Sequence, residues 1–155
     1  MTAADAILLT GTVGTGKTTV LIEIGERLEA GLEPYALVDL DWLAWVRPAA
    51  NSGATVHGVL IENLRHVAAT FRAAGVQRIV LSRAVTDAAD VEAIRAALGI
   101  ERLVVARLVA ASQVIEERLR ARDRAPSSPS IWMGRRRSRV RPGAATWSSG
   151  PMMRM

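Results

Sequence analysis

Cysteine is absent from this chain of 155 residues. Without a thiol the chain has no disulfide framework, no thiolate zinc site and no cysteine nucleophile. Its two histidines, His57 and His66, are isolated and lack metal-ligand spacing, so we assign neither a role. No apolar run approaches membrane-spanning length, and no charged-then-apolar signal peptide precedes the first strand. We therefore expect a cytoplasmic protein without a membrane segment.

Lysine is almost absent as well. Of the 20 basic side chains, Lys17 is the single lysine and the rest are arginine. A lysine ammonium on a thin, flexible stem can reach the β- and γ-phosphates of a nucleotide across a tight loop, whereas a guanidinium is broader and prefers a bidentate fork. The residues around it match the phosphate-binding pattern G-x-x-x-x-G-K-[ST] without a mismatch: Gly11-Thr12-Val13-Gly14-Thr15-Gly16-Lys17-Thr18.

The flanks of this octet favour a nucleotide site over a glycine-rich turn that fits the pattern by chance. Residues 6–10 are an apolar run suited to a buried parallel strand. After Lys17 a helical period places Val20, Leu21, Ile24 and Leu28 on one face. Strand, loop and helix N-terminus would direct backbone N–H groups at one phosphate. The predicted nucleotide contacts are Gly11, Thr12, Val13, Gly14, Thr15, Gly16, Lys17, Thr18 and Thr19.

The chain then alternates strands and helices as far as residue 122. We predict strands over 35–38, 79–81 and 103–106, and helices over 55–74, 88–98 and 112–122, with a mobile loop over 46–56. Gly75 and Gly99 would end two of the helices, and Asp87 would cap the start of one. This alternation predicts an α/β fold with a parallel sheet, helices on both faces and right-handed crossovers.

Two carboxylates follow the predicted strand 35–38 in the segment Asp39-Leu40-Asp41. The carboxyl ends of parallel strands open on one crevice, so this pair would face the phosphate loop. Asp39 could then reach a Mg²⁺ that Thr18 helps to hold, while Asp41 accepts a proton from an attacking hydroxyl. The alternative is a solvated strand end. The predicted strand 79–81 has no acid at its end, which shifts the metal role to the first pair.

Three further side chains near this crevice have two interpretations each. Trp42 and Trp45 could line a substrate pocket or pack beneath the loop, and we expect at least one of them to pack in the core. Arg83 could bind an anionic group of a substrate or pair with a neighbouring carboxylate. Asp41, Trp42 and Arg83 are the predicted substrate residues.

An arginine-rich run ends the last predicted helix. Arg118 and Arg122 are four residues apart and share one helix face, where they could clamp the transferring phosphoryl group and the adenine side of the nucleotide. The alternative is a basic helix end that complements the macrodipole, with Glu116 and Glu117 as partners. We favour the functional interpretation, and the predicted catalytic residues are Lys17, Asp41, Arg118 and Arg122.

The net charge of +5 is concentrated at the end of the chain. Residues 1–125 hold 14 basic and 15 acidic side chains, whereas residues 126–155 hold six arginines and no acid. We therefore predict a near-neutral domain over 1–125 that does not bind nucleic acid, followed by an atypical basic tail. The tail could be disordered and bind RNA, membrane or a partner. We favour a change of reading frame near residue 125, because many residue types shift there at once.

Residues 11–18, the Asp39-Leu40-Asp41 segment and, more loosely, residues 118–122 resemble the small P-loop kinases of the adenylate-kinase-like group. Shikimate, gluconate and adenylylsulfate kinases and chloramphenicol phosphotransferases belong to it. The resemblance covers residues 5–124 and implies a three-layer P-loop NTPase fold with strand order 2-3-1-4. A fifth strand usual in the group is missing here, and no complete gluconate or shikimate signature is present.

The resemblance implies ATP and Mg²⁺ as cofactors and a small hydroxylated molecule as substrate. The predicted function is transfer of the γ-phosphate of ATP to a hydroxyl of that molecule. The alternative is a nucleotide-binding or regulatory ATPase module, or a kinase remnant, that phosphorylates no small molecule. The acidic pair favours the kinase, and the abnormal end of the chain favours the module.

Overall fold

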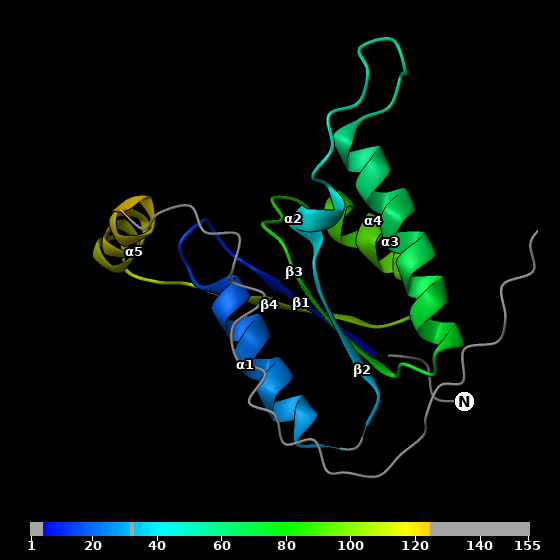
Figure 1. The fold of residues 1–155 in the computed structure, drawn as a ribbon, viewed down its shortest axis with the longest axis horizontal. Helices are drawn as coiled ribbons and strands as arrows, with labels where there is room; N and C mark the ends of the chain where they lie inside the picture. The colour runs from blue at the N-terminus through cyan, green and yellow to red at the C-terminus, as the bar shows by residue number, and fades with distance from the viewer. Residues whose placement is uncertain (1–4, 32, 125–155) are drawn as a thin grey trace, which may run out of the picture. The chain divides into compact units, whose positions relative to one another are not determined.

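A computed structural model of the protein describes residues 5–31 and 33–124. Contacts divide the chain into Met1–Asp123 and Arg124–Met155, and the tail over 126–155 lies outside the described residues. The elements follow the predicted alternation (Figure 1): β1 (Asp5–Thr10), α1 (Lys17–Glu29), β2 (Tyr35–Asp39), α2 (Leu40–Leu43), α3 (Val56–Ala73), β3 (Arg78–Ser82), α4 (Ala88–Leu98), β4 (Leu103–Arg107) and α5 (Ser112–Arg124).

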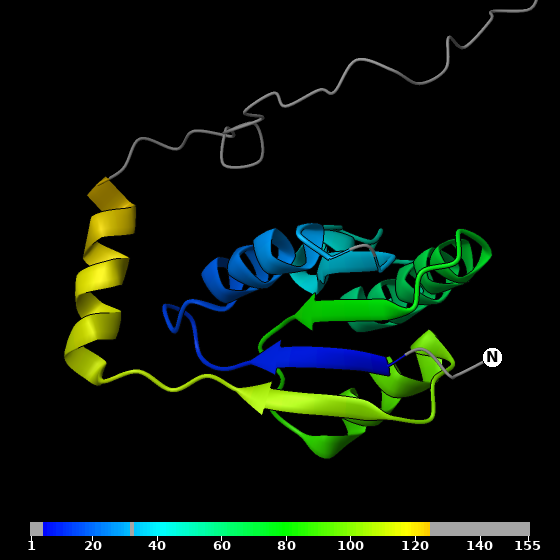
Figure 2. The ribbon, with the colours of Figure 1, turned by 90° about the horizontal axis from the view of Figure 1, so that it is seen from below.

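The four strands form one parallel sheet in the order β2-β3-β1-β4, which confirms the predicted fold class and strand order. Figure 2 shows β3, β1 and β4 as neighbouring arrows that point the same way. In the register of the sheet, Leu8 lies beside Leu81 on one side and Val105 on the other. Because all four strands are parallel, their carboxyl ends meet at one edge, and the phosphate loop leaves β1 there.

The helices cover both faces of the sheet, so the layers are those that the sequence predicts. Figure 1 shows α1 on one side of the sheet and α3 and α4 on the other. Leu21 of α1 packs with Leu9 and Val80, whereas Leu60 and Ile94 join the larger cluster around Leu8. Each such buried side chain stabilises the fold by about 1.5–3 kcal/mol relative to an exposed one. This core fixes where the carboxyl edge of the sheet lies.

Side chains and glycines set the helix ends as predicted at two of the junctions. The Asp87 carboxylate caps α4 by accepting the Asp90 N–H at 2.8 Å, and Gly99 ends the same helix in the left-handed region at φ 61°. Thr55 caps α3 by accepting the Gly58 N–H at 2.9 Å. Such caps satisfy backbone N–H groups that a helix leaves unpaired at its start.

The structure contains one helix that the sequence did not predict. Four residues directly after β2 form α2, and Asp39 caps it by accepting the Asp41 N–H at 3.2 Å. A single turn of helix is too short to produce a hydrophobic period. The consequence for the site is that the acidic pair lies at a strand-to-helix junction.

Within the described residues, no helix combines the length and the apolar character that crossing a membrane requires.

Candidate active site

The phosphate loop joins the end of β1 to the start of α1. Gly16 precedes α1 in the left-handed region at φ 94°, where a side chain would be strained. Among the described residues no side chain caps this helix, so its first N–H groups remain available to an anion. The positive end of the helix dipole points at the same place. This backbone geometry is therefore suited to an anion.

Lys17 lies over this loop. Its ammonium donates to the carbonyl oxygens of Gly11 at 2.9 Å and Thr12 at 3.1 Å. The Thr15 hydroxyl also donates to the Thr12 carbonyl, at 2.8 Å, and Thr15 is buried. These bonds hold the loop curved around the ammonium. A phosphate on the helix N-terminus would find the lysine charge directly beside it.

Thr18 and Asp39 meet across the crevice between α1 and β2. The Thr18 hydroxyl donates to Oδ2 of Asp39 at 3.2 Å. Both are oxygen donors of the kind that Mg²⁺ prefers, and Mg²⁺ is commonly bound through one or two carboxylates and the phosphates of the substrate. In the described residues there is no group of three or more acidic or histidine side chains that could hold a metal by itself. Two oxygen donors suit a metal ion that the phosphates of a nucleotide also bind.

Arg83 lies beside Asp41. The Arg83 guanidinium lies 3.8 Å from Oδ1 of Asp41, with the arginine side chain 18% exposed and the carboxylate 67% exposed. The sequence left two interpretations of Arg83, binding of an anionic substrate group or pairing with a carboxylate. The structure shows the second, a pair with Asp41. The backbone N–H of Arg83 donates to the Leu9 carbonyl at 3.0 Å, which anchors the residue where β1 passes into the loop. Asp41 therefore has one positive charge nearby and is largely open to solvent.

The two tryptophans stack on each other at the surface. The ring centroids of Trp42 and Trp45 are 4.8 Å apart, and both side chains are exposed. The expectation that at least one packs in the core is therefore wrong. Leu40 is the buried residue of α2. Because Leu40 faces the core, Trp42, two residues later in the same turn, faces outward.

The helix α5 lies against the phosphate loop through part of the predicted arginine run. Arg118 donates to the Gly14 carbonyl at 3.3 Å, and a Cβ added at Gly14 would lie only 2.9 Å from Cγ2 of Ile115. Glycine is therefore required at position 14 for this close approach. Arg120 pairs with Glu116 at 3.2 Å, the kind of partner that the alternative interpretation names. The side chain of Arg122 lies outside the described residues.

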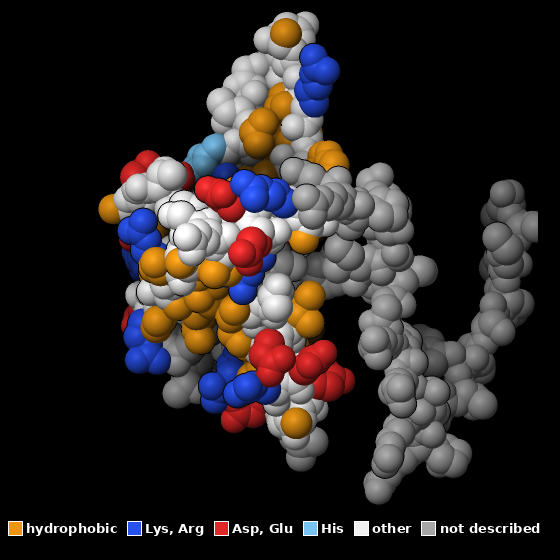
Figure 3. Space-filling view, turned by 90° about the vertical axis from the view of Figure 1, so that its left-hand side faces the viewer, with side chains coloured by type: hydrophobic (Ala, Val, Ile, Leu, Met, Phe, Trp, Pro, Cys, Tyr) orange, Lys and Arg blue, Asp and Glu red, His pale blue; other side chains and the backbone are white. Residues whose placement is uncertain are grey.

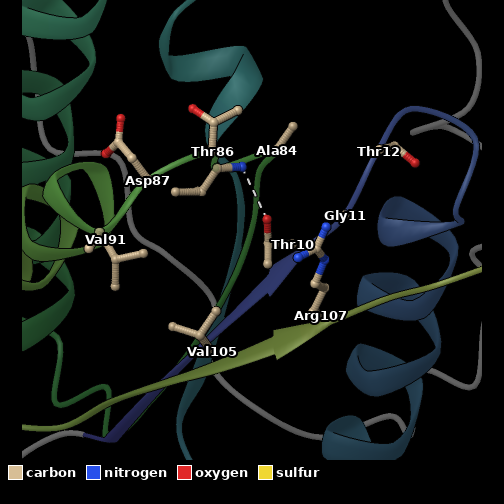
Figure 4. Close-up of a pocket in the computed structure, with 11 residues that line it drawn as sticks. Thr10, Gly11, Thr12, Ala84, Thr86, Asp87, Val91, Val105 and Arg107 are labelled. Carbon is tan, nitrogen blue, oxygen red and sulfur yellow. Dashed lines mark hydrogen bonds between the residues drawn. The ribbon is translucent and has the colours of Figure 1, made fainter.

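A cavity of about 490 Å³ lies beside the first residues of the phosphate loop, at the ends of β1, β3 and β4. Within its lining, the Thr10 hydroxyl accepts the Val85 N–H at 3.0 Å, which joins the end of β1 to the segment after β3 (Figure 4). In Figure 4 the side chain of Arg107 points from the end of β4 toward the start of the loop. The cavity is lined by Thr10, Gly11, Thr12, Ala84, Val85, Thr86, Asp87, Ala88, Val91, Val105 and Arg107.

Sequence reasoning did not single out Arg107, although a signal for it exists. It ends a parallel strand, and the strand-end rule applied to the second strand would also have selected it here. Asp41, Trp42 and Arg83, the predicted substrate residues, do not line this cavity. The structure therefore places the predicted acceptor side and this cavity in different parts of the carboxyl edge.

Tyr35, Glu92 and Arg95 each have a clear pKa shift, and all three lie away from the phosphate loop. A hydrogen bond to Glu29 raises the pKa of Tyr35, at the amino end of β2. On α4, the hydrogen bond from Arg95 lowers the pKa of Glu92. His57, on α3, pairs with Asp90 at 3.4 Å, and His66 pairs with Glu62 at 3.1 Å. These groups lie on helix and strand surfaces, outside the candidate site.

Comparisons with known proteins give matches in structure. A scan against protein-family models found none, and a search of curated proteins found none. The chain is similar to an APS kinase of Mycobacterium tuberculosis solved with AMPPNP and APS, at 24% identity over 77% of this chain and 73% of that one, with a TM-score of 0.50. It is similar to the tunicamycin resistance protein of Deinococcus radiodurans, at 21% identity over 81% and 73%, with a TM-score of 0.53.

A sugar kinase from a Janibacter species also matches, at 18% identity over 76% of this chain and 66% of that one, with a TM-score of 0.52. The chain thus spans just under two thirds of the length of that kinase. At these identities the likeness establishes the fold, which is that of the small P-loop kinases, as the sequence resemblance implies.

Proposed function

We propose that this protein is an ATP-dependent kinase that transfers the γ-phosphate of ATP to a hydroxyl of a small molecule. The observation that carries the proposal is the 3.2 Å contact between the Thr18 hydroxyl and Asp39, because it joins the phosphate loop to the acidic pair after β2. A nucleotide on the loop would present its terminal phosphate to these carboxylates. The similarity to solved kinases of the same fold supports this choice.

Each residue of the site has a role in this proposal. Lys17 and the first N–H groups of α1 bind the β- and γ-phosphates and stabilise the charge that develops on them. Thr18 and Asp39 would hold the Mg²⁺ of a bound nucleotide, and that ion would supply positive charge against the phosphates. Arg118, already bonded to the loop at Gly14, contributes positive charge from α5. We keep Arg122 in the same role as a prediction.

The transfer itself needs a proton acceptor. In the proposed reaction the acceptor oxygen attacks the γ-phosphorus, the bond to the β-phosphate oxygen breaks, and ADP leaves. The proton of the attacking hydroxyl passes to Asp41. The positive charge of Arg83 lies 3.8 Å from the Asp41 carboxylate, where it could also attract an anionic group of the acceptor, and the exposed Trp42 ring would cover one side of the acceptor. Asp41, Trp42 and Arg83 thus form the proposed acceptor side.

One observation favours the second candidate, a nucleotide-binding or regulatory ATPase module. Asp41 is 67% exposed, and the cavity beside the loop is formed by other residues. A kinase acceptor needs to be held so that water does not compete for the phosphoryl group. If the acceptor side stays open in solution, the protein would bind and slowly hydrolyse ATP without a specific acceptor.

A panel assay of ADP release separates the two candidates. The full chain is incubated with ATP and Mg²⁺, alone and with individual hydroxylated compounds such as sugars, sugar acids and nucleosides. For a kinase we expect one class of compound to raise ADP release and to become phosphorylated, with the increase lost in Asp41→Asn. ADP release that no compound raises would favour the ATPase module. Failure to bind ATP would contradict both candidates.

A further inference from the structure

The outer edge of β4 is one of the two edges of the described sheet. The sheet order leaves β4 at one edge, and no strand pairs with that edge within the residues that the structure describes. Along β4 and the segment after it, valines are exposed at positions 104, 105 and 109. Figure 3 shows hydrophobic side chains gathered on the side of the molecule that carries α5. An exposed, apolar edge strand is a template for pairing with another strand.

The direction of the β4 backbone groups determines which residues could form hydrogen bonds with a partner strand. The Leu108 N–H donates to the Thr10 carbonyl at 2.7 Å, so the amide of residue 108 points toward β1. Amides alternate in direction along a strand. Val104 and Ala106 therefore also bond toward β1, and Leu103, Val105 and Arg107 direct their N–H and C=O groups toward the free edge.

A second copy of the same strand fits this edge in one symmetric register. A two-fold axis gives antiparallel strands, and the outward amides of both copies meet only when odd-numbered residues oppose odd-numbered residues. Centring the axis on Val104 places Leu103 opposite Val105 of the second copy. The same register places Glu101 opposite Arg107 of the second copy, twice by symmetry. Centring on Leu103 or Val105 loses this opposite-charge pair.

The side chains on the face toward α1 are consistent with this register. Val104 is 47% exposed and lies beside Ile7 in the sheet, and Ile7 is itself partly exposed. In contrast, the neighbouring Leu8 and Leu9, which α3, α4 and α1 cover, are buried. Pairing two copies at Val104 would bring the two exposed valines together and extend the apolar surface toward Ile7. Cross-strand apolar pairs and opposite charges both stabilise antiparallel strands.

We propose that two copies of this chain associate through β4, antiparallel and centred on Val104, into one continuous eight-stranded sheet. The charge of the chain favours a second copy over the tail as the occupant of this edge. Residues 126–155 contain six arginines and no acidic residue, so they offer no counter-charge to Arg107. A second copy offers Glu101. This inference concerns assembly and does not depend on the proposed kinase activity.

The absence of cysteine from the whole chain allows a direct cross-linking test. Directly opposed residues in a non-hydrogen-bonded antiparallel pair have Cα atoms about 4.5 Å apart, which suits a disulfide. The full-length Val104→Cys protein should therefore form a disulfide dimer on mild oxidation. The matched control is Val56→Cys, because Val56 at the start of α3 is 44% exposed and lies outside the sheet. It should cross-link at least about tenfold more slowly.

Charge exchange tests the register in the full chain by sedimentation velocity. Wild type should show a concentration-dependent dimer, and Glu101→Arg or Arg107→Glu should weaken it about tenfold, because like charges would then oppose each other. The double variant should restore the dimer. A monomeric wild type, equal cross-linking of the two cysteine variants, or a double variant weaker than the singles would overturn the proposal. Dimers that appear only after removal of residues 126–155 would also overturn it, and would assign the edge to the tail.

Discussion

The phosphate side and the acceptor side of the crevice are built in different ways. On the phosphate side, consecutive residues make the site: Lys17 bonds to the carbonyls of Gly11 and Thr12, and Gly16 leaves the helix start uncapped. On the acceptor side, Asp41 lies in α2 and Arg83 follows β3, 42 residues apart in the chain, and the two side chains lie 3.8 Å apart with Asp41 largely exposed. A local motif fixes its own geometry, whereas a pocket assembled from distant elements depends on packing between them.

The largest effect should come from the phosphate side. We expect Lys17→Ala to lower kcat by about 10³-fold or more and to weaken nucleotide binding, because the ammonium stabilises charge on the transferring phosphate. The fold should be retained, as measured by circular dichroism and thermal unfolding. Arg27→Ala on the same helix removes an exposed cation that pairs with Glu23, and it should leave turnover within about twofold of wild type. Near-normal turnover of Lys17→Ala would exclude the phosphate-loop assignment.

On the acceptor side, we expect Asp41→Asn to lower kcat by about 10²–10⁴-fold with little change in ATP affinity, because it removes the proton acceptor and leaves the phosphate loop intact. Steady-state kinetics and ATP titration measure the two quantities separately. The control is Glu62→Gln, an exposed carboxylate on α3 that pairs with Arg65. If Asp41→Asn keeps kcat within about twofold of wild type, the acceptor side has no catalytic role and the ATPase module is favoured.

Asp39, which joins the two sides, should determine how activity depends on the Mg²⁺ concentration. We expect Asp39→Asn to raise the Mg²⁺ concentration needed for half-maximal activity by about tenfold, because one of the two oxygen donors loses its charge. A Mg²⁺ titration at saturating ATP measures it. A change in activity that is the same at every Mg²⁺ concentration would argue against Asp39 as a metal ligand and for a structural role as the cap of α2.

The smallest effect should come from the end of the chain. We expect removal of residues 126–155 to leave ATP affinity unchanged, because every phosphate-contacting residue in the proposal precedes Arg124. Titration calorimetry at fixed salt measures it. A large loss of ATP affinity would show that the tail contributes to the nucleotide site.

The sequence predicted those parts of the molecule that local patterns specify. Periodicity and end signals such as Asp87 and Gly99 gave the strands, the helices and their order, because those signals act within a few residues. The short α2 was missed because four residues carry no period. The exposed position of Trp42 depends on how separate elements pack, and it leaves no pattern in neighbouring residues. Arg107 does carry a signal, the end of a parallel strand, but its contribution to a cavity depends on packing between elements.

The most direct test of the proposed site is a double-mutant cycle across the contact that joins its two sides. ATP affinity is measured by calorimetry for wild type, Thr18→Ala, Asp39→Asn and the double variant, each with Mg²⁺ and with the metal chelated. If Thr18 and Asp39 hold the metal of one bound nucleotide, the two losses in Mg²⁺ should be non-additive by about 1 kcal/mol or more, and the coupling should disappear without metal. Losses that add in Mg²⁺, or that are the same without it, would contradict a shared metal at this junction.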